Sequence, residues 1–141
     1  MRIYVDMVGD LFHFGHVNLL KQARELGDYL IVGVHSDKVV ESYKRLPIMT
    51  MEERIATIFS CRYVDEVIPN APLSIDLKWI NKHNIDMVVH GNDVSEGLSQ
   101  NWYKVPIEMG ILHLIPYTSG ISTTDIIKRC KNAYSIPSLD K

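Results

Sequence analysis

The sequence predicts an α/β fold built on a parallel sheet, and three observations support this. Short, continuously apolar runs alternate along the chain with segments of helical periodicity. That order implies parallel strands joined by right-handed crossovers. The length of 141 residues favours a single domain with a real core. The turns richest in reactive side chains all follow predicted strands, where open α/β sheets bind ligands: residues 10–16, 35–38, 91–93 and 117–124.

The first half of the chain is expected to contain three strands, two of them central and buried because their apolar runs are continuous. Gly27 closes the first helical segment, since glycine commonly follows the last residue of a helix. Thr50 and Glu53 have the spacing of a capping box, with Ile55, Ile58 and Phe59 on the apolar face of the helix that follows. In order, the expected elements are strand 3–8, helix 17–26, strand 29–34, helix 37–43, a helix from 51 onward and strand 64–68.

The second half is expected to continue the alternation. The polar segment 94–103 is interpreted as a mobile loop with a helix after it. Ser122 and Asp125 have the spacing of a second capping box, which would open the last helix. The domain is predicted to cover residues 1–134, and 135–141 to form a frayed tail. The remaining expected elements are helix 73–83, strand 86–90 and strand 111–115.

The composition restricts the possible partners and compartment. A formal net charge of −2 argues against sequence-independent binding of nucleic acid, which usually needs a basic chain. The two cysteines form no CxxC pair, so a reduced, cytoplasmic chain is the simple interpretation. The N-terminus leads directly into a strand, so no signal peptide is expected. No apolar run is long enough to span a bilayer, so insertion into a membrane is not expected.

The turn over residues 10–16 is the strongest candidate for chemistry. It places His13 and His16 around Gly15, between a strand and the start of a helix. Free backbone N–H groups and the helix dipole favour an anion there, and a glycine lets the backbone approach a ligand. The imidazoles would add hydrogen bonds to phosphoryl oxygens. Two alternatives stay open from the residues alone: a pair of metal ligands, or a buried structural pair.

A second candidate anion site precedes the last helix. Ser122, Thr123 and Thr124 form a cluster of hydroxyls at its N-terminus, where at least one is expected to cap the helix. The others would be free to hold phosphates, and Gly120 is expected to supply a backbone conformation closed to other residues. Lys44 lies in a basic loop and has a solvated surface position as its simple alternative.

These residues resemble a known family. Histidine-x-glycine-histidine after a first strand is the signature of the HxGH nucleotidyltransferases, and two further segments resemble its cytidylyltransferase branch. They are Arg62-Tyr63-Val64-Asp65-Glu66-Val67 and Gly120-Ile121-Ser122-Thr123-Thr124. The resemblance runs from about Arg2 to about Arg129. It implies a single Rossmann-like domain with a five-stranded parallel sheet flanked by helices, and a homodimer with Arg62 and Asp65 near its interface.

The resemblance also implies roles for individual residues. His16 would contact the triphosphate most directly with His13 beside it, and Lys44 would clamp phosphates. Asp10 would help to hold Mg²⁺. Arg45 and Tyr117 would face the acceptor. The implied nucleotide-binding residues are Asp10, Gly15, Asp37, Arg54, Gly91, Asp93, Gly120, Ile121, Ser122, Thr123 and Thr124. The remaining histidines are interpreted as mostly structural, with His90 the best outside candidate for the site.

The sequence departs from the enzymes acting on choline, ethanolamine or glycerol phosphate at two places. They read Asp-Gly-x-aromatic-Asp where this chain has Asp6-Met7-Val8-Gly9-Asp10, and Arg-Thr where it has Tyr117-Thr118. The loops 43–47 and 115–118 instead resemble those of 2-aminoethylphosphonate cytidylyltransferases, and small capsule-pathway enzymes acting on phosphoglutamine are similar too. The changes therefore suggest a different acceptor.

The expected function is a CTP-dependent cytidylyltransferase. An oxygen of a small phosphate or phosphonate would attack the α-phosphorus of CTP, with Mg²⁺ neutralising the triphosphate and pyrophosphate leaving. The candidate acceptors are phosphoethanolamine, 2-aminoethylphosphonate and phosphoglutamine, and the product would serve lipid headgroup or surface-polysaccharide assembly. Two rivals stay open: an adenylyltransferase of the same superfamily, and a non-catalytic nucleotide-binding domain, which the residue Tyr117 favours.

Overall fold

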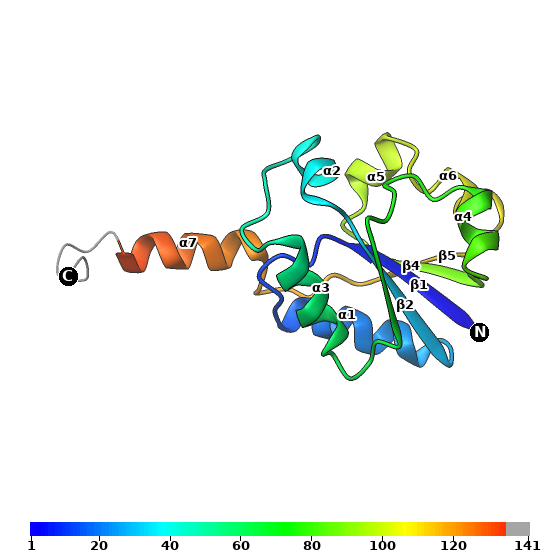
Figure 1. Cartoon of the computed structure of the whole chain (residues 1–141), viewed down its shortest axis with the longest axis horizontal. Coiled ribbons are helices and arrows are strands. Elements are labelled where there is room, and N and C mark those ends of the chain that lie inside the picture. The colour runs from blue at the N-terminus through cyan, green and yellow to red at the C-terminus, as the bar shows by residue number, and fades with distance from the viewer. Residues whose placement is uncertain (135–141) are drawn as a thin grey trace.

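Five parallel strands form one sheet in the order β3-β2-β1-β4-β5 in the computed structural model, which describes residues 1–134 (Figure 1). The strands are β1 (Arg2–Met7), β2 (Tyr29–Val34), β3 (Glu66–Pro69), β4 (Met87–Gly91) and β5 (Leu112–Ile115). The central strand β1 pairs with β2 over its whole length and with β4 over three residues. The predicted α/β fold with a five-stranded parallel sheet is confirmed.

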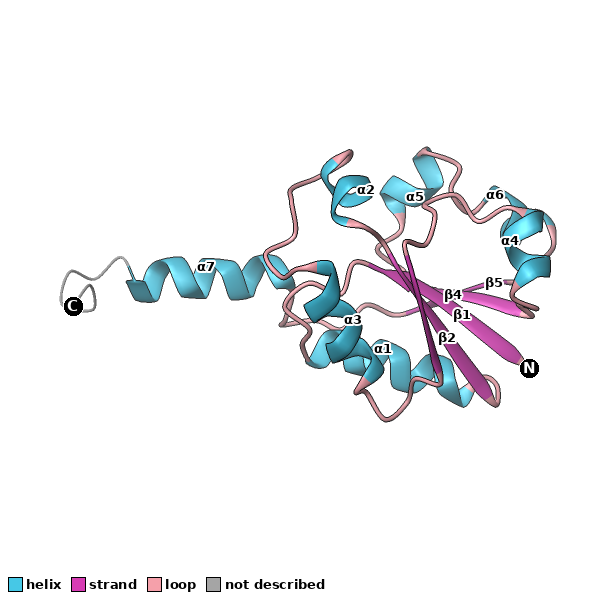
Figure 2. Cartoon of the chain, in the orientation of Figure 1, coloured by secondary structure: helices cyan, strands magenta, loops and turns pink. Residues whose placement is uncertain are grey.

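Helices cover both faces of this sheet (Figure 2). In chain order they are α1 (Phe14–Glu25), α2 (Asp37–Glu41), α3 (Met51–Phe59), α4 (Leu77–Lys82), α5 (Ser95–Ser99), α6 (Lys104–Glu108) and α7 (Thr123–Tyr134). Helices α1 and α3 pack on one face, while α4 and the segment before α6 pack on the other. Helix α7 extends away from the rest of the chain (Figure 1).

The alternation of side chains along β1 explains why it is the central strand. Ile3, Val5 and Met7 join the core under α1 and α3, whereas Tyr4 joins the core under α4. Both faces are therefore covered, as the continuous apolar run predicted. Burial of these side chains leaves the carboxyl end of β1 fixed beside those of β2 and β4, and the candidate turns begin there.

The capping box at the start of α3 is confirmed. The Thr50 hydroxyl accepts from the backbone N–H of Glu53 at 3.2 Å, and the Glu53 carboxylate accepts from that of Thr50 at 2.9 Å. Phe59 was wrongly placed on the apolar face: it is the last residue of α3, and 61% of it is exposed. Gly120 has a φ of +86°, which agrees with its predicted conformation.

Two predicted elements in the second half differ from those observed. The expected helix 73–83 begins only at Leu77, because Asp76 caps it and the N–H of Ile75 donates to the carbonyl of Trp102 instead. The segment 94–103 contains the short helix α5 rather than a simple loop. The predicted tail 135–141 lies outside the described residues. Within residues 1–134, no helix is long and apolar enough to cross a membrane.

Candidate active site

One cavity of about 580 Å³ lies at the carboxyl ends of the strands. Its walls come from the segments that follow β1, β2, β4 and β5, and from the loop between α2 and α3. The structure therefore brings together turns that are more than a hundred residues apart in the sequence. The residues singled out from the sequence that line this cavity are Asp10, His13, Gly15, His16, Lys44, Arg45, His90, Asp93, Tyr117, Ile121, Ser122, Thr123 and Thr124.

The two histidines form a capping box at the N-terminus of α1. The N–H of Gly15 donates to Nδ1 of His13, and the N–H of His13 donates to Nδ1 of His16, both at 3.0 Å. A ring nitrogen that accepts a hydrogen bond carries no proton, so the proton of each neutral ring lies on Nε2. The backbone thus fixes both imidazoles in the form that donates from Nε2. Gly15 is required because a Cβ there would lie 2.8 Å from the His13 ring.

The surroundings keep both imidazoles uncharged. Burial, then the nearby His13, and also Lys44 lower the pKa of His16 to about 4, with Asp10 opposing them. Burial and then the charge of Arg129 lower the pKa of His13. The His16 ring also stacks on Phe12, with the ring centroids 5.2 Å apart. At neutral pH the pair therefore offers two hydrogen-bond donors without a full positive charge.

The lowered pKa of His16 predicts a loss of stability at acid pH. An unfolded histidine titrates near 6.5, so between pH 6.5 and 4 the unfolded chain binds a proton that the folded chain does not. The contribution of His16 is complete above pH 6.5 and falls by about 3 kcal/mol as the pH drops to 4. Denaturant unfolding of the wild type and of His16→Asn at several pH values measures it. Identical pH dependence in both proteins would contradict this assignment.

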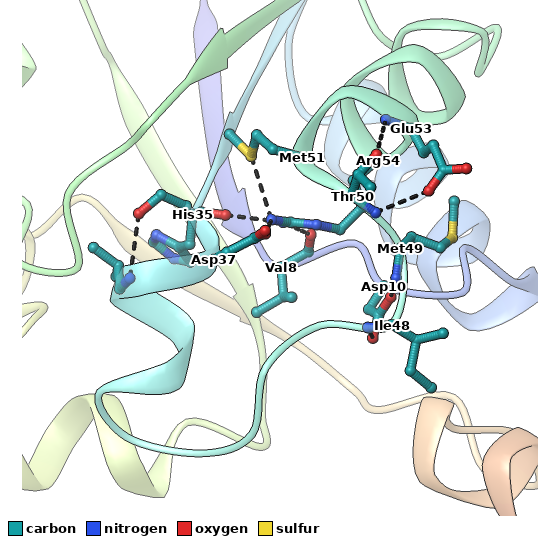
Figure 3. A network of polar contacts seen from close by, with 12 residues as sticks. Val8, Asp10, His35, Asp37, Ile48, Met49, Thr50, Met51, Glu53 and Arg54 are labelled. Atoms are coloured by element: carbon teal, nitrogen blue, oxygen red, sulfur yellow. Dashed lines mark hydrogen bonds and ion pairs between the residues drawn. The ribbon is translucent and has the colours of Figure 1, made fainter.

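Asp10 is almost completely buried, and both oxygens of its carboxylate accept hydrogen bonds from the protein backbone. One carboxylate oxygen accepts from the N–H of Ile48 at 2.8 Å, and the other from that of Met49 at 2.9 Å (Figure 3). These bonds hold the loop that carries Lys44. The Lys44 side chain reaches solvent, but the surrounding protein removes part of its hydration and, with the charge of Arg45, lowers its pKa.

A buried acidic group at another part of the cavity wall was not singled out from the sequence. Asp6 accepts a hydrogen bond from the Tyr103 hydroxyl at 2.9 Å and lies 3.3 Å from Nε2 of His35. Burial alone would raise the pKa of Asp6, but the bond and charge of His35 hold it below its usual value, helped by His90. The available signal was an aspartate inside an otherwise apolar central strand.

Aromatic side chains surround this acidic group. Tyr43, Trp102 and Tyr103 all line the cavity, and the Tyr43 and Trp102 rings pack edge to face with their centroids 5.1 Å apart. Burial, followed by the charges of Asp6 and Glu96, raises the pKa of Tyr43 to about 12. The phenol therefore stays neutral. Both oxygens of Asp6 already have partners in Tyr103 and His35, but its negative charge beside neutral aromatic faces still suits a small organic cation.

The hydroxyl groups at the start of α7 have different roles. Ser122 caps the helix, since its Oγ accepts from the N–H of Asp125 at 3.1 Å, as predicted. Thr123 donates to the carbonyl of Asp10 at 3.0 Å, which joins the start of α7 to the histidine turn. The Thr124 side chain is exposed at the cavity, and Tyr117 donates to the carbonyl of Ile121 at 3.3 Å. Ser122 and Thr124 therefore keep hydroxyl protons available for a phosphate.

Four residues expected to bind the nucleotide do not line the cavity: Asp37, Arg54, Gly91 and Gly120. Arg54 is fully buried and donates to the carbonyls of Val8 and His35 and to the carboxylate of Asp37 (Figure 3). The guanidinium thus fastens α3 to the ends of β1 and β2. The sequence pattern could not distinguish this buried cross-link from a phosphate contact.

The described residues do not fit a preformed metal site. Within residues 1–134, no three histidine, cysteine, aspartate or glutamate side chains are grouped so as to hold a metal ion. Both oxygens of Asp10 already accept hydrogen bonds from backbone N–H groups. The expected role of Asp10 as a Mg²⁺ ligand therefore finds no support in its contacts, and the structure gives it a task within the protein.

The fold and this cavity define the class of the protein. Its fold is that of a protein described as a lipopolysaccharide core biosynthesis protein from Thermoplasma volcanium GSS1, with a TM-score of 0.68 and 24% identity over 86% of this chain and 98% of that one. This likeness shows the fold alone. Residues 9–129 match the family model described as cytidylyltransferase-like, and the chain belongs to that family.

Curated relatives agree with this assignment. The chain is 49% identical over 133 residues to an ethanolamine-phosphate cytidylyltransferase of Dictyostelium discoideum, covering 90% of this chain and 37% of that protein. It is 40% identical over 139 residues to choline-phosphate cytidylyltransferase A of Homo sapiens, covering 96% of this chain and 38% of that protein. The chain thus spans little more than a third of the length of these relatives.

Proposed function

We propose that this domain transfers CMP from CTP to phosphoethanolamine, with release of pyrophosphate. The observation that carries the proposal is a single cavity with two chemically different parts. One part offers neutral hydrogen-bond donors, a lysine and a helix N-terminus, which suit phosphates. The other offers a buried carboxylate among aromatic rings, which suits an ammonium group. The similarity to ethanolamine-phosphate cytidylyltransferases agrees with this acceptor.

The reaction is an in-line displacement at phosphorus. A phosphate oxygen of the acceptor attacks the α-phosphorus of CTP, a new P–O bond forms, and the bond to the β-phosphate breaks. The Nε2–H groups of His13 and His16 donate to phosphoryl oxygens as negative charge shifts toward the leaving group. Lys44 and the N-terminus of α7 share that charge. Positioning and charge stabilisation suffice for phosphoryl transfer, and no covalent intermediate on the protein is needed.

The acceptor is proposed to bind with its ammonium group toward Asp6. A primary ammonium carries N–H donors for a carboxylate oxygen, whereas a quaternary ammonium makes only electrostatic and cation–π contacts. This difference supports phosphoethanolamine over phosphocholine. A phosphonate such as 2-aminoethylphosphonate has the same two ends and is a competing substrate, while phosphoglutamine is larger and adds a carboxylate near Asp6.

The metal is proposed to enter as part of the substrate, the Mg–CTP complex. The triphosphate itself supplies oxygen ligands, and Mg²⁺ commonly keeps several waters. A product carrying a CMP-activated ethanolamine headgroup would serve phospholipid synthesis. The homodimer implied by the family resemblance and the cytoplasmic location expected from the cysteine usage stay predictions.

Asp6→Asn tests the acceptor assignment. The asparagine oxygen can still accept from Tyr103, but the negative charge that faces the cavity and the Nε2 of His35 is gone. The KM for phosphoethanolamine is expected to rise at least about tenfold, which corresponds to the loss of one charge-assisted contact. The KM for CTP should stay within about twofold, since that ligand lies toward the histidines. Initial rates with each substrate varied in turn measure both constants, and equal rises in both would refute a specific role for Asp6.

Thermal unfolding with nucleotides separates the proposal from its rivals. CTP at a hundred times its Kd should stabilise the folded domain by about 2.7 kcal/mol, and ATP at the same concentration should give a much smaller shift. A larger shift with ATP would favour an adenylyltransferase. A shift with CTP but no pyrophosphate release with any acceptor would favour a binding domain without turnover.

A further inference from the structure

We propose that Asp10 is a positioning residue that sets the place of the Lys44 loop, and that it does not bind metal. The Lys44 loop is defined as residues 42–50, between α2 and α3. The part of this inference that concerns turnover rests on the proposed cytidylyl transfer. The part that concerns the loop stands on contacts within the protein alone.

The carboxylate of Asp10 matches the loop backbone closely. Its two oxygens accept from two consecutive N–H groups, those of Ile48 and Met49. The N–H of Leu11 donates in turn to the sulfur of Met49 at 3.2 Å, so the histidine turn and the loop hold each other at three points. Ile48 is 57% exposed, so apolar packing of this residue does not hold the loop there. The anchor is therefore mainly polar.

Arg54, in α3, links the two helices that flank this loop. This guanidinium donates to Asp37 at the start of α2 and to the carbonyl of Val8 at the end of β1 (Figure 3). Lys44 lies near the α2 end of the loop, where its own N–H donates to the carbonyl of Val40. Asp10 is the anchor on the side of the cavity, because it lines the cavity while Arg54 does not.

Asp10 also connects the loop with the second phosphate-binding element. Its backbone carbonyl accepts from the Thr123 hydroxyl at the start of α7, at 3.0 Å. One residue thus joins the histidine turn, the Lys44 loop and the N-terminus of α7. The negative charge of Asp10 also acts on two residues of the cavity: it raises the pKa of Lys44 and partly offsets the lowering of the pKa of His16.

Asp10→Asn tests the inference on the ligand-free protein. The amide retains one oxygen, so it can accept only one of the two N–H groups and presents its own N–H₂ to the other. Hydrogen exchange at Ile48 and Met49 is expected to become at least about tenfold faster. Asp93→Asn is the matched control: it removes an exposed carboxylate of the same cavity that accepts no bond from this loop, and exchange at both amides should not change.

Turnover supplies the second readout. The kcat of Asp10→Asn is expected to fall at least about tenfold, while the Mg²⁺ concentration for half-maximal rate stays within about twofold. Ile48→Pro removes one donor and leaves the carboxylate intact, so it should reproduce part of the loss in kcat. This second variant keeps the test valid if Asp10→Asn does not fold.

Three results would overturn the proposal. One is a several-fold higher Mg²⁺ requirement in Asp10→Asn with unchanged exchange, which would make Asp10 a metal ligand. Another is faster exchange with normal kcat, which would separate the loop from turnover. The third is normal kcat in Ile48→Pro with a large loss in Asp10→Asn. A wild-type protein without turnover would instead refute the proposed function, and the exchange comparison would still decide whether Asp10 anchors the loop.

Discussion

His16→Ala is expected to lower kcat by about a thousandfold while the domain stays folded. The Nε2–H of His16 is a fixed donor in the cavity, and removing one such donor from a charge-stabilising site costs up to about 4 kcal/mol of transition-state stabilisation. The structural loss is smaller: alanine deletes the Nδ1 acceptor for the His13 N–H, worth about 1 kcal/mol, together with the ring that stacks on Phe12. Steady-state kinetics and denaturant unfolding measure the two effects separately.

His16→Asn separates chemistry from capping. The asparagine oxygen lies near the position of Nδ1 and can still accept from the His13 N–H, but the Nε2–H donor is absent. We expect stability close to that of the wild type and a kcat as low as in His16→Ala. His113→Ala, at an exposed position of β5, is the control and should retain full activity. A near-normal kcat in His16→Asn would show that His16 serves only to cap α1.

Lys44→Ala is expected to lower kcat/KM by at least about a hundredfold. The ammonium is the cation of a short, anchored loop beside the histidine turn, and a partly dehydrated cation interacts strongly with phosphate. Because its pKa is lowered, the wild-type rate should also decline at alkaline pH before an ordinary lysine would titrate. The declining limb should be absent from the residual activity of Lys44→Ala.

Lys38→Ala provides the matched control for this prediction. Lys38 is an exposed residue of α2, six positions before Lys44, and does not line the cavity. Its removal should leave kcat/KM within about twofold of the wild type, since a single exposed charge is well screened. An equal loss in Lys38→Ala and Lys44→Ala would mean that the basic character of the surface, rather than one placed ammonium, attracts the nucleotide.

The sheet and the histidine turn were predictable because local patterns specify them. Continuous apolar runs fix buried strands, and parallel strands bring their carboxyl ends to one edge. The expected site at that edge, with His13, His16 and the start of the last helix together, followed from these patterns, whereas Lys44 was assigned to it by the family resemblance. The helix caps at Thr50 and Ser122 were also predictable from residues a few positions apart, and both caps are present.

The contacts that buried charged residues make within the protein were not predictable. Whether Arg54 points into a cavity or bonds to the protein depends on the position of the carbonyl groups that follow β1 and β2. Those positions are set only when the sheet is assembled. Asp6 was overlooked because its partners, His35 and Tyr103, lie far from it in the sequence. The bonds that Asp10 makes within the protein were not predictable for the same reason, since its donors come from residues 48 and 49.

Pyrophosphate release is the most direct test of the central claim that the domain is a cytidylyltransferase. The assay would combine Mg–CTP with phosphoethanolamine, phosphocholine or 2-aminoethylphosphonate, and would repeat each pair with Mg–ATP. The account predicts release with CTP and phosphoethanolamine, a lower rate with phosphocholine, and none with ATP. Release with ATP alone, or none with CTP and any acceptor despite clear CTP binding, would contradict it.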